Sequence, residues 1–199
     1  MAFTYFFRDY QTIELLVEKL LCYVQGRARI NIWDAGCASG QEPFTLAIVL
    51  SEKMGRYSFK NVMIHASDID ISDSFREKIE NGVYGKEDVE RIPRHIFDRY
   101  FLQIDEQNFQ ISSNIRDRVK FFKHDLLSLS PIREDFSMIL CKNVLLHFSP
   151  QDRAEVVKMY HNSLLLDGLL AMEHTQPIPD ETASLFIREF ANAQIYRKV

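Results

Sequence analysis

The chain has 199 residues, 46% of them hydrophobic, which is enough for one domain with a substantial core. Its 24 Lys and Arg against 28 Asp and Glu leave a net charge of −4, which excludes the basic excess of a nucleic-acid-binding protein or a polybasic membrane anchor. Three cysteines without a C-x-x-C pair, no run of about 20 apolar residues and no signal peptide at the start predict a cytoplasmic protein without disulfides or membrane insertion.

In chain order, the hydrophobic pattern alternates between helices and strands. Apolar residues at helical spacing predict a first helix over residues 13–24, closed by Gly26. A β-rich run at residues 30–35 precedes a glycine turn and a second helix that begins near Pro43. The alternation continues with a strand at 62–67, a helix at 72–81, a strand at 137–141, a helix at 150–165 and a strand at 169–173. This order predicts an α/β fold with a doubly wound, mostly parallel sheet.

Two regions depart from this alternation of strands and helices. Residues 100–125 hold two short β-like runs, 108–111 and 119–122, which predict a small β-hairpin insertion. At the C-terminus, residues 184–190 and 194–198 predict a terminal antiparallel pair of strands, although a helix over 182–190 fits the pattern as well. We expect residues 1–199 to form a single domain around one sheet.

The turn after the first predicted strand is a candidate ligand-binding loop. It contains Gly36 and Gly40, and glycine permits both positive φ angles and close approach of a ligand to the backbone. The loop lacks the G-x-G-x-x-G pattern of dinucleotide sites and the lysine of a P-loop. An ordinary tight turn between strand and helix fits the same residues.

Acidic residues follow two further predicted strands. Asp68 ends the strand at 62–67, where a carboxylate can accept hydrogen bonds from both hydroxyls of a ribose. Asp68 can also cap the next helix, but Asp70 or Ser72 can take that role instead. Asp125 and Leu126 follow an apolar run and suit the edge and the face of an adenine, although a plain strand exit explains them equally well.

Together these residues resemble the catalytic domain of the CheR family, the chemotaxis receptor glutamate methyltransferases. The resemblance extends over almost the whole chain and rests on five stretches in the family's order: Thr4-Tyr5-Phe6-Phe7-Arg8, residues 33–43 (WDAGCASGQEP), Ala66-Ser67-Asp68-Ile69-Asp70, Cys141-Lys142-Asn143-Val144-Leu145, and Ile195-Tyr196-Arg197-Lys198. The combination of T-x-F-F-R, G-C-A-[ST]-G-x-E-P and S-D-I-D is far more specific than any one turn.

The resemblance implies a Rossmann-like methyltransferase fold that binds S-adenosylmethionine and releases S-adenosylhomocysteine. The residues it implies at the cofactor are Thr4, Arg8, Ala35, Gly36, Gln41, Asp68, Ile69, Asp125, Leu126, Lys142 and Asn143. The implied reaction is methylation of glutamate side chains in the cytoplasmic region of a chemoreceptor. A glutamate is already ionised at neutral pH, so the reaction needs no strong general base.

The resemblance also implies two catalytic residues. The Arg8 guanidinium can grip a carboxylate at two points, and His147 can donate a hydrogen bond beside the reacting group. Each has a structural alternative: Arg8 can pair with Asp9 or another acid, and a lone histidine beside an apolar strand is commonly a structural residue.

Several positions differ from the family pattern. The family usually has Glu where this chain has Gln41, commonly Arg where it has Lys142, and Tyr where it has His147. A neutral Gln41 predicts weaker cofactor binding. Only three residues precede Thr4, so the family's N-terminal helical domain is expected to be absent. These differences leave open a methyltransferase for another acceptor, or a non-catalytic module that binds S-adenosylmethionine or S-adenosylhomocysteine.

Two other enzyme classes fit the sequence poorly. A nicotinamide oxidoreductase is disfavoured because the G-x-G-x-x-G pattern is missing. A metal hydrolase is disfavoured because the histidines are scattered and show neither H-E-x-x-H nor H-x-x-E-H spacing. We therefore expect no metal site.

Overall fold

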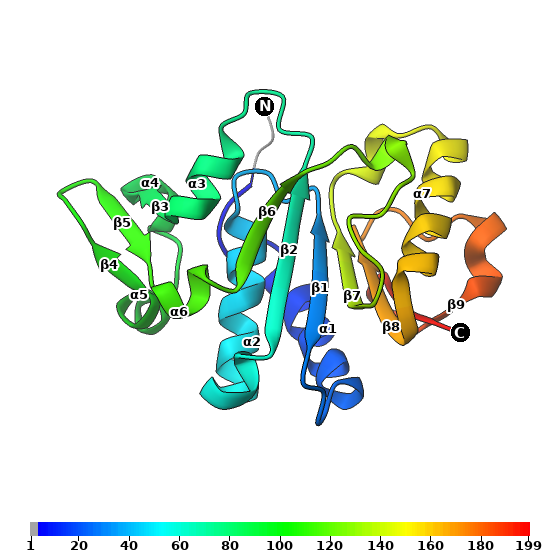
Figure 1. Ribbon diagram of the computed structural model, residues 1–199, viewed down its shortest axis with the longest axis horizontal. Helices are drawn as coiled ribbons and strands as arrows, with labels where there is room; N and C mark the ends of the chain where they lie inside the picture. The colour runs from blue at the N-terminus through cyan, green and yellow to red at the C-terminus, as the bar shows by residue number, and fades with distance from the viewer. Residues whose placement is uncertain (1–3) are drawn as a thin grey trace.

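The computed structural model describes residues 4–199, which fold around a seven-stranded sheet with the order β6-β2-β1-β7-β8-β10-β9 (Figure 1). The strands are β1 (Ile30–Ala35), β2 (Val62–Asp68), β6 (Val119–Lys123), β7 (Phe136–Cys141), β8 (Leu164–Met172), β9 (Phe186–Arg188) and β10 (Ile195–Lys198). The five from β6 to β8 pair in parallel, whereas β10 is antiparallel to both β8 and β9. The predicted doubly wound sheet with a terminal antiparallel pair is therefore confirmed.

The order of the chain reverses at β1. This strand pairs with β2 on one side and with β7 on the other, and the strands that follow each of them continue outward in opposite directions. In open α/β sheets a crevice forms at the carboxyl ends of the strands at such a reversal. The fold thereby places the segments that follow β1, β2 and β7 around one crevice.

The long helices bury the apolar stripes that the sequence predicts. They are α1 (Tyr10–Tyr23), α2 (Gln41–Phe59) and α7 (Pro150–Ser163), with the shorter α3 (Phe75–Asn81) after β2. In α1, Leu16, Val17 and Leu20 are fully buried. The start of α7 combines Pro150 in its first turn with Ser149, whose hydroxyl accepts a hydrogen bond from the Asp152 amide at 3.1 Å.

The sheet separates two hydrophobic cores. In β1, Ile30 and Ile32 belong to the core that includes α1 and α2, whereas Trp33 and Ala35 belong to the core that includes α7. Because successive side chains of a strand point to opposite faces, a strand covered on both sides must be apolar at nearly every position. This explains why β1 and β7 have no exposed residue.

A small second sheet, with the order β3-β5-β4, projects beside α3 at the left of Figure 1. Its elements are β3 (Val83–Gly85), β4 (Phe101–Gln103) and β5 (Asn108–Ile111), with short helices α4 (Lys86–Val89), α5 (Arg94–Tyr100) and α6 (Ser113–Arg116). The predicted hairpin insertion was only partly right, because its second run, 119–122, is not in this sheet. That run is β6, which pairs with β2 at the edge of the main sheet.

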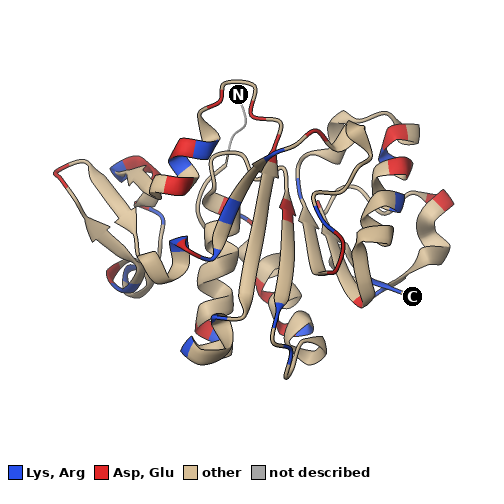
Figure 2. Ribbon diagram, in the orientation of Figure 1, with Lys and Arg blue, Asp and Glu red and all other residues tan. Residues whose placement is uncertain are grey.

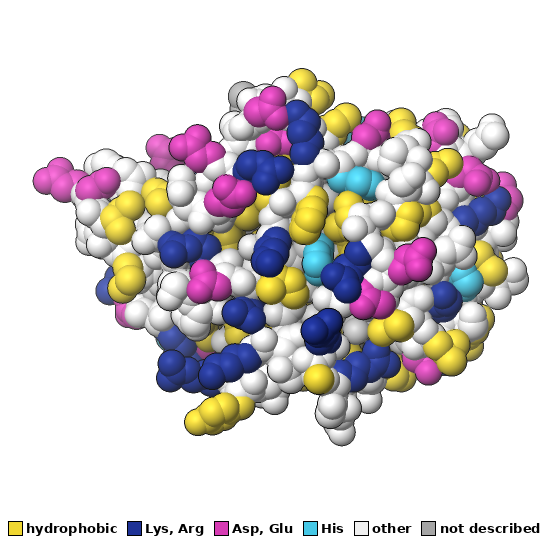
Figure 3. Space-filling model, viewed as in Figure 1, with side chains coloured by type: hydrophobic (Ala, Val, Ile, Leu, Met, Phe, Trp, Pro, Cys, Tyr) yellow, Lys and Arg dark blue, Asp and Glu magenta, His cyan; other side chains and the backbone are white. Residues whose placement is uncertain are grey.

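The remaining regular elements are three short 3-10 turns: η1 (Leu126–Ser128), η2 (Leu145–His147) and η3 (Asp180–Leu185). Lys and Arg are interspersed with Asp and Glu along α3 and α7 (Figure 2), and the face in Figure 3 carries cationic, anionic and hydrophobic side chains together. Within residues 4–199, no helix has the length and apolar character needed to cross a bilayer.

Candidate functional site

A cleft of about 450 Å³ opens at the carboxyl ends of β1, β2 and β7, where the order of the chain reverses. The N-terminal segment contributes Thr4 and Arg8 to its wall. The other lining residues are Gly36, Cys37, Ala38, Glu42, Asp68, Lys142, Asn143, Val144, Leu146 and His147. Segments that lie more than 130 residues apart in the sequence, Thr4 and His147 among them, therefore line a single cleft.

A smaller cavity of about 200 Å³ adjoins this cleft, and the two share Gly36, Asp68 and Val144. Its other lining residues are Ser67, Ile69, His124, Asp125, Leu126, Leu127 and Phe148. It is more apolar than the cleft, and its lining includes leucine and phenylalanine side chains as well as the exposed Asp125, whose carboxylate accepts a hydrogen bond from the Leu127 amide at 2.9 Å. A flat heterocycle with one polar edge matches this lining.

The turn after β1 has a shape that requires glycine at position 36. The amides of Gly36 and Cys37 both donate to the Ser67 carbonyl, at 2.7 and 3.0 Å, which pulls the turn against the end of β2. Gly36 has a φ of +97°, and a Cβ atom there would lie 2.1 Å from Cγ2 of Val144. Only glycine fits both conditions, so the backbone of the turn is exposed to the cleft without a side chain.

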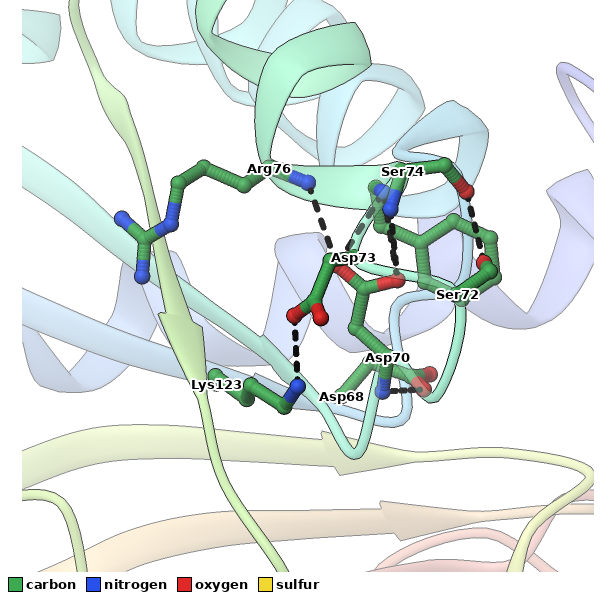
Figure 4. A network of polar contacts seen from close by, with 8 residues as sticks. Asp68, Asp70, Ser72, Asp73, Ser74, Arg76 and Lys123 are labelled. Atoms are coloured by element: carbon green, nitrogen blue, oxygen red, sulfur yellow. Dashed lines mark hydrogen bonds and ion pairs between the residues drawn. The ribbon is translucent and has the colours of Figure 1, made fainter.

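The Asp68 carboxylate is held by two backbone amides, one from the turn after β1 and one from its own loop. Its Oδ2 accepts a hydrogen bond from the Ala38 amide at 3.0 Å, and its Oδ1 accepts one from the Asp70 amide at 3.1 Å. Each carboxylate oxygen has a further lone pair for a ligand hydroxyl. The capping alternative for Asp68 does not hold, because Asp70 takes that role: its carboxylate accepts the amides of Ser74, Phe75 and Arg76 at the start of α3 (Figure 4).

One fully buried carboxyl group, Asp34, and one largely buried one, Glu42, lie at the cleft. Asp34 is fully buried, and neither of its carboxyl oxygens has a hydrogen-bond partner in the part of the chain that the structure describes. Burial raises the pKa of Asp34 well above its ordinary value, and the charge of Glu42 raises it further. Burial also raises the pKa of Glu42, although the Lys142 ammonium at 3.7 Å acts in the opposite direction. The positive charge around Asp34 and Glu42 is therefore too small to offset the cost of burying their ionised carboxylates.

Lys142 is the cation nearest to Glu42, but it is shared. Its side chain is only 2% exposed, and its Nζ lies 2.8 Å from Oδ2 of Asp9, closer than to Glu42. Burial raises the pKa of Asp9, but the hydrogen bond and charge of Lys142 together with the charges of Arg8 and His174 outweigh burial, so the net shift is downward. The Lys142 ammonium is thus paired mainly with Asp9. The charges of Glu42 and Asp34 can therefore be balanced by a cationic ligand in the cleft.

These features fit S-adenosylmethionine, whose chemistry combines an ammonium and a sulfonium with a ribose and an adenine. Glu42 and Asp34 can balance the positive charges. Asp68 can accept the ribose hydroxyls, and the apolar cavity beside Asp125 and Leu126 can cover the adenine. The exposed backbone at Gly36 allows the ligand to lie in close contact with the turn after β1.

Most of the residues predicted from the sequence line the cleft or its side cavity. They are Thr4, Arg8, Gly36, Asp68, Ile69, Asp125, Leu126, Lys142, Asn143 and His147. Ala35 lies just behind the turn, and its side chain is buried in the core that includes α7.

The structure places Gln41, which was expected to face the cofactor, outside the lining of the cleft. Gln41 is absent from the cleft lining: its Oε1 accepts from Ser39 at 2.7 Å and its Nε2 donates to Asp88 of α4 at 3.3 Å. Residues 41 and 42 are neighbours on α2 and point about 100° apart around its axis, so Glu42 lines the cleft instead. The missed signal was Glu42 itself, the acid of the G-x-E-P stretch.

Comparisons with known proteins identify the family to which the chain belongs. The model of the family described as "CheR methyltransferase, SAM binding domain" matches residues 2–193. The chain is 31% identical to a "Chemotaxis protein methyltransferase" of Borreliella burgdorferi over 88% of its own length and 64% of that protein's. It is 26% identical to "Chemotaxis protein methyltransferase 2" of Vibrio cholerae over 98% of its own length and 69% of that protein's. The chain thus spans about two thirds of the length of these relatives.

Among solved structures, TrmN from Thermus thermophilus is similar in fold. The match has a TM-score of 0.52 and 13% sequence identity, and it covers 94% of this chain and 49% of that protein. At this identity the similarity supports the architecture of the sheet and helices.

Proposed function

Because the chain belongs to the family of CheR methyltransferase SAM-binding domains, its cofactor is S-adenosylmethionine, and we propose that it methylates glutamate side chains in the cytoplasmic region of chemoreceptors. The observation that carries the proposal is the single cleft in which Arg8, Gly36 and Asp68 meet. The names of the relatives support the chemotaxis substrate. The compartment we propose is the cytoplasm, as the composition predicts.

The chain's own residues have distinct parts in this proposal. When bound, the cofactor supplies an electrophilic methyl group. Asp68 orients the ribose, and Asp125 and Leu126 hold the adenine. Glu42, and not the neutral Gln41, is the residue we place beside the methionine part, so the weaker binding expected from a neutral Gln41 is no longer required.

Arg8 is the residue we assign to the acceptor carboxylate. It lines the cleft from the N-terminal segment, and the segment is fixed by the Phe7 amide, which donates to Thr45 Oγ1 of α2 at 3.0 Å. A guanidinium can hold both oxygens of a carboxylate and so restrict its approach to the methyl group. His147 lines the same cleft and can donate a hydrogen bond to that carboxylate.

Thermal melting with S-adenosylhomocysteine tests the cofactor site. At about 100 times its dissociation constant, a ligand stabilises the folded state by about 2.7 kcal/mol, which corresponds to a rise of about 5–10 °C in Tm for a domain of this size. In Asp68→Ala the rise is expected to disappear. Asp73→Ala is the matched control, because Asp73 lies in the same loop but its carboxylate bonds only the exposed Lys123 at 2.5 Å. A full rise in Asp68→Ala would contradict the assignment.

Transfer of a radiolabelled methyl group to receptor fragments tests the acceptor. A label that is released by mild base supports a glutamyl methyl ester. A base-stable label identifies a methyltransferase for another acceptor. Binding of S-adenosylhomocysteine without transfer to any fragment identifies a binding module.

A further inference from the structure

Arg8 lies between two residues with unusual backbone conformations. Phe7 has a φ of 62° and Asp9 has a φ of 50°, both in the left-handed region that residues with a Cβ atom rarely adopt. Such a conformation persists only where the surrounding structure enforces it, and these conformations cluster at functional sites. The contacts that hold Phe7 and Asp9 therefore determine the path of the chain at Arg8.

On one side of Arg8, helix α2 holds Phe7. The Phe7 amide donates to Oγ1 of Thr45 at 3.0 Å, and the same hydroxyl donates to the Gln41 carbonyl at 2.7 Å. The Phe7 ring also lies against the ring of Tyr10, with a centroid distance of 5.6 Å. These contacts fix the peptide that precedes Arg8.

On the other side of Arg8, the Asp9 carboxylate is held by Lys142, with Oδ2 of Asp9 at 2.8 Å from Nζ of the lysine. The Asp9 carbonyl accepts the amides of Thr12 and Ile13, at 2.9 and 3.3 Å, but the Asp9 carboxylate caps no amide of α1. The start of α1 therefore uses the backbone of Asp9 and leaves its carboxylate for the ion pair.

Lys142 is itself fixed by the main sheet. It directly follows β7, whose last residue, Cys141, pairs with Met172 of β8, and the Lys142 side chain is almost completely buried. Lys142 lines the cofactor cleft, and together with Asp9 it also lines a second cavity, of about 590 Å³. Asp9 is not among the lining residues of the cleft, so any effect that it has there passes through a neighbouring residue.

The charges around Lys142 favour the same pairing when a cationic ligand fills the cleft. Lys142 also lies 3.7 Å from Glu42, the acid that we place beside the methionine part. A cationic ligand that pairs with Glu42 leaves the Lys142 ammonium to Asp9, and a buried ammonium is costly without a partner. The ion pair between Asp9 and Lys142 is therefore expected to persist in the state that receives the acceptor.

We propose that Asp9 is a positioning residue for the acceptor: through its ion pair with Lys142, it holds Arg8 where the guanidinium can grip the acceptor carboxylate in the cleft. This inference rests on the proposed function, which assigns Arg8 to that carboxylate. Asp9 contacts neither the acceptor nor the cofactor, so its loss is expected to weaken methyl transfer without weakening cofactor binding.

Asp9→Asn tests this role, because it removes the charge and keeps a residue that tolerates a left-handed conformation. The acceptor is a cytoplasmic fragment of a chemoreceptor, and the donor is radiolabelled S-adenosylmethionine at saturation. We expect kcat/KM for the acceptor to fall about tenfold. The dissociation constant of S-adenosylhomocysteine, measured by calorimetric titration, is expected to stay within about twofold.

Glu14→Gln is the matched control. It removes a negative charge from the same helix, but Glu14 pairs with Lys53 and lines neither the cleft nor the second cavity. This variant is expected to transfer methyl groups and to bind S-adenosylhomocysteine as the unmodified chain does.

A double-mutant cycle separates positioning from a merely structural role. If Asp9 acts through Arg8, the double variant Arg8→Ala with Asp9→Asn loses no more activity than Arg8→Ala alone. Because Asp9→Asn takes a partner from a buried ammonium, Asp9→Asn with Lys142→Gln provides a second test without that unpaired charge. It is expected to show the same fall in kcat/KM for the acceptor.

NMR relaxation of the whole chain, labelled with ¹⁵N, tests the positioning of Arg8 without turnover. In Asp9→Asn the order parameter of the Arg8 amide is expected to fall from about 0.85, the value for rigid backbone, towards about 0.6. In Glu14→Gln it is expected to remain at the value for the unmodified chain.

The outcomes separate this inference from the proposed function. If the unmodified chain methylates the fragment but Asp9→Asn retains its kcat/KM, the positioning role is overturned and the proposed function stands. The same holds if Asp9→Asn costs as much activity in the Arg8→Ala background as it does alone. If the unmodified chain methylates no fragment, the proposed function itself fails. An unchanged order parameter at Arg8 would overturn the positioning role in either case.

Discussion

At the scale of single residues, the cleft depends on the missing side chain of Gly36 and on the buried carboxyl group of Asp34. Gly36 allows the turn after β1 to lie against Val144, which follows β7. Asp34, two residues earlier, is a buried acid without a hydrogen-bond partner among the described residues. The unpaired carboxyl group of Asp34 lowers the stability of the domain, and a cationic ligand in the cleft can offset that cost.

Gly36→Ala tests the first of these features. The new methyl group would collide with Cγ2 of Val144, and the backbone would keep a φ of +97°. We expect a loss of about 2–4 kcal/mol in the free energy of unfolding, measured by urea denaturation, together with loss of the Tm rise with S-adenosylhomocysteine. Gly26→Ala is the control: its φ is +74°, but its Cβ would meet nothing within 4 Å, so only about 1–2 kcal/mol of backbone strain is expected. Equal losses in the two variants would show that the contact with Val144 is unimportant.

At the scale of elements, the loop between β2 and α3 connects the stability of a helix to the ligand site. Asp70 is almost fully buried and accepts the first amides of α3, while its own amide donates to Asp68 (Figure 4). The Asp73 carboxylate of the same loop bonds the exposed Lys123 of β6 instead. The start of α3 therefore determines where the loop places the Asp68 carboxylate.

We expect Asp70→Ala to destabilise the domain by about 1–2 kcal/mol, the usual effect of losing a helix cap, and to weaken binding of S-adenosylhomocysteine. Urea denaturation and calorimetric titration measure the two effects. Ser74→Ala is the matched control, because the Ser74 hydroxyl contacts only Ser72 and caps no amide of α3. If Asp70→Ala and Ser74→Ala bind S-adenosylhomocysteine with the same binding constant, the helix cap does not influence the ligand site.

At the scale of the whole molecule, the N-terminal segment joins the small sheet to the main domain. Phe6 is buried and makes edge-to-face contacts with Tyr84 of β3 and Phe101 of β4, at centroid distances of 4.8 and 5.4 Å. Tyr84 also donates to the Ser39 carbonyl in the turn after β1, at 2.8 Å. The cleft, the small sheet and the segment that carries Arg8 therefore depend on one aromatic cluster.

Phe6→Ala is expected to cost about 3–5 kcal/mol and to speed hydrogen exchange in β3, β4 and β5 as well as in the turn after β1. Leu102→Ala is the control, since Leu102 lies on the same small sheet but is 64% exposed. If exchange increases only in the small sheet, the aromatic cluster does not support the cleft.

The sequence predicted the order of strands and helices well because that information is local. Glycine turns, the Ser149-Pro150 helix start and continuous apolar runs such as β7 each report on a few neighbouring residues. It was less successful for residues 119–122, whose β-pattern was correct but whose partner was not. Pairing between strands joins segments far apart in the chain, and the sequence of a short apolar run does not identify the strand with which it pairs.

For this protein, then, the sequence by itself determined the fold class, the family and most of the residues that line the cleft, because these follow from local patterns and short motifs. Only the tertiary structure decided that Glu42 and not Gln41 faces the cleft, that β6 belongs to the main sheet, and that Lys142 lies between two cavities with Asp9 as its partner. Those facts depend on the rotation of a helix about its axis and on contacts between distant segments, which the packing of the whole chain sets.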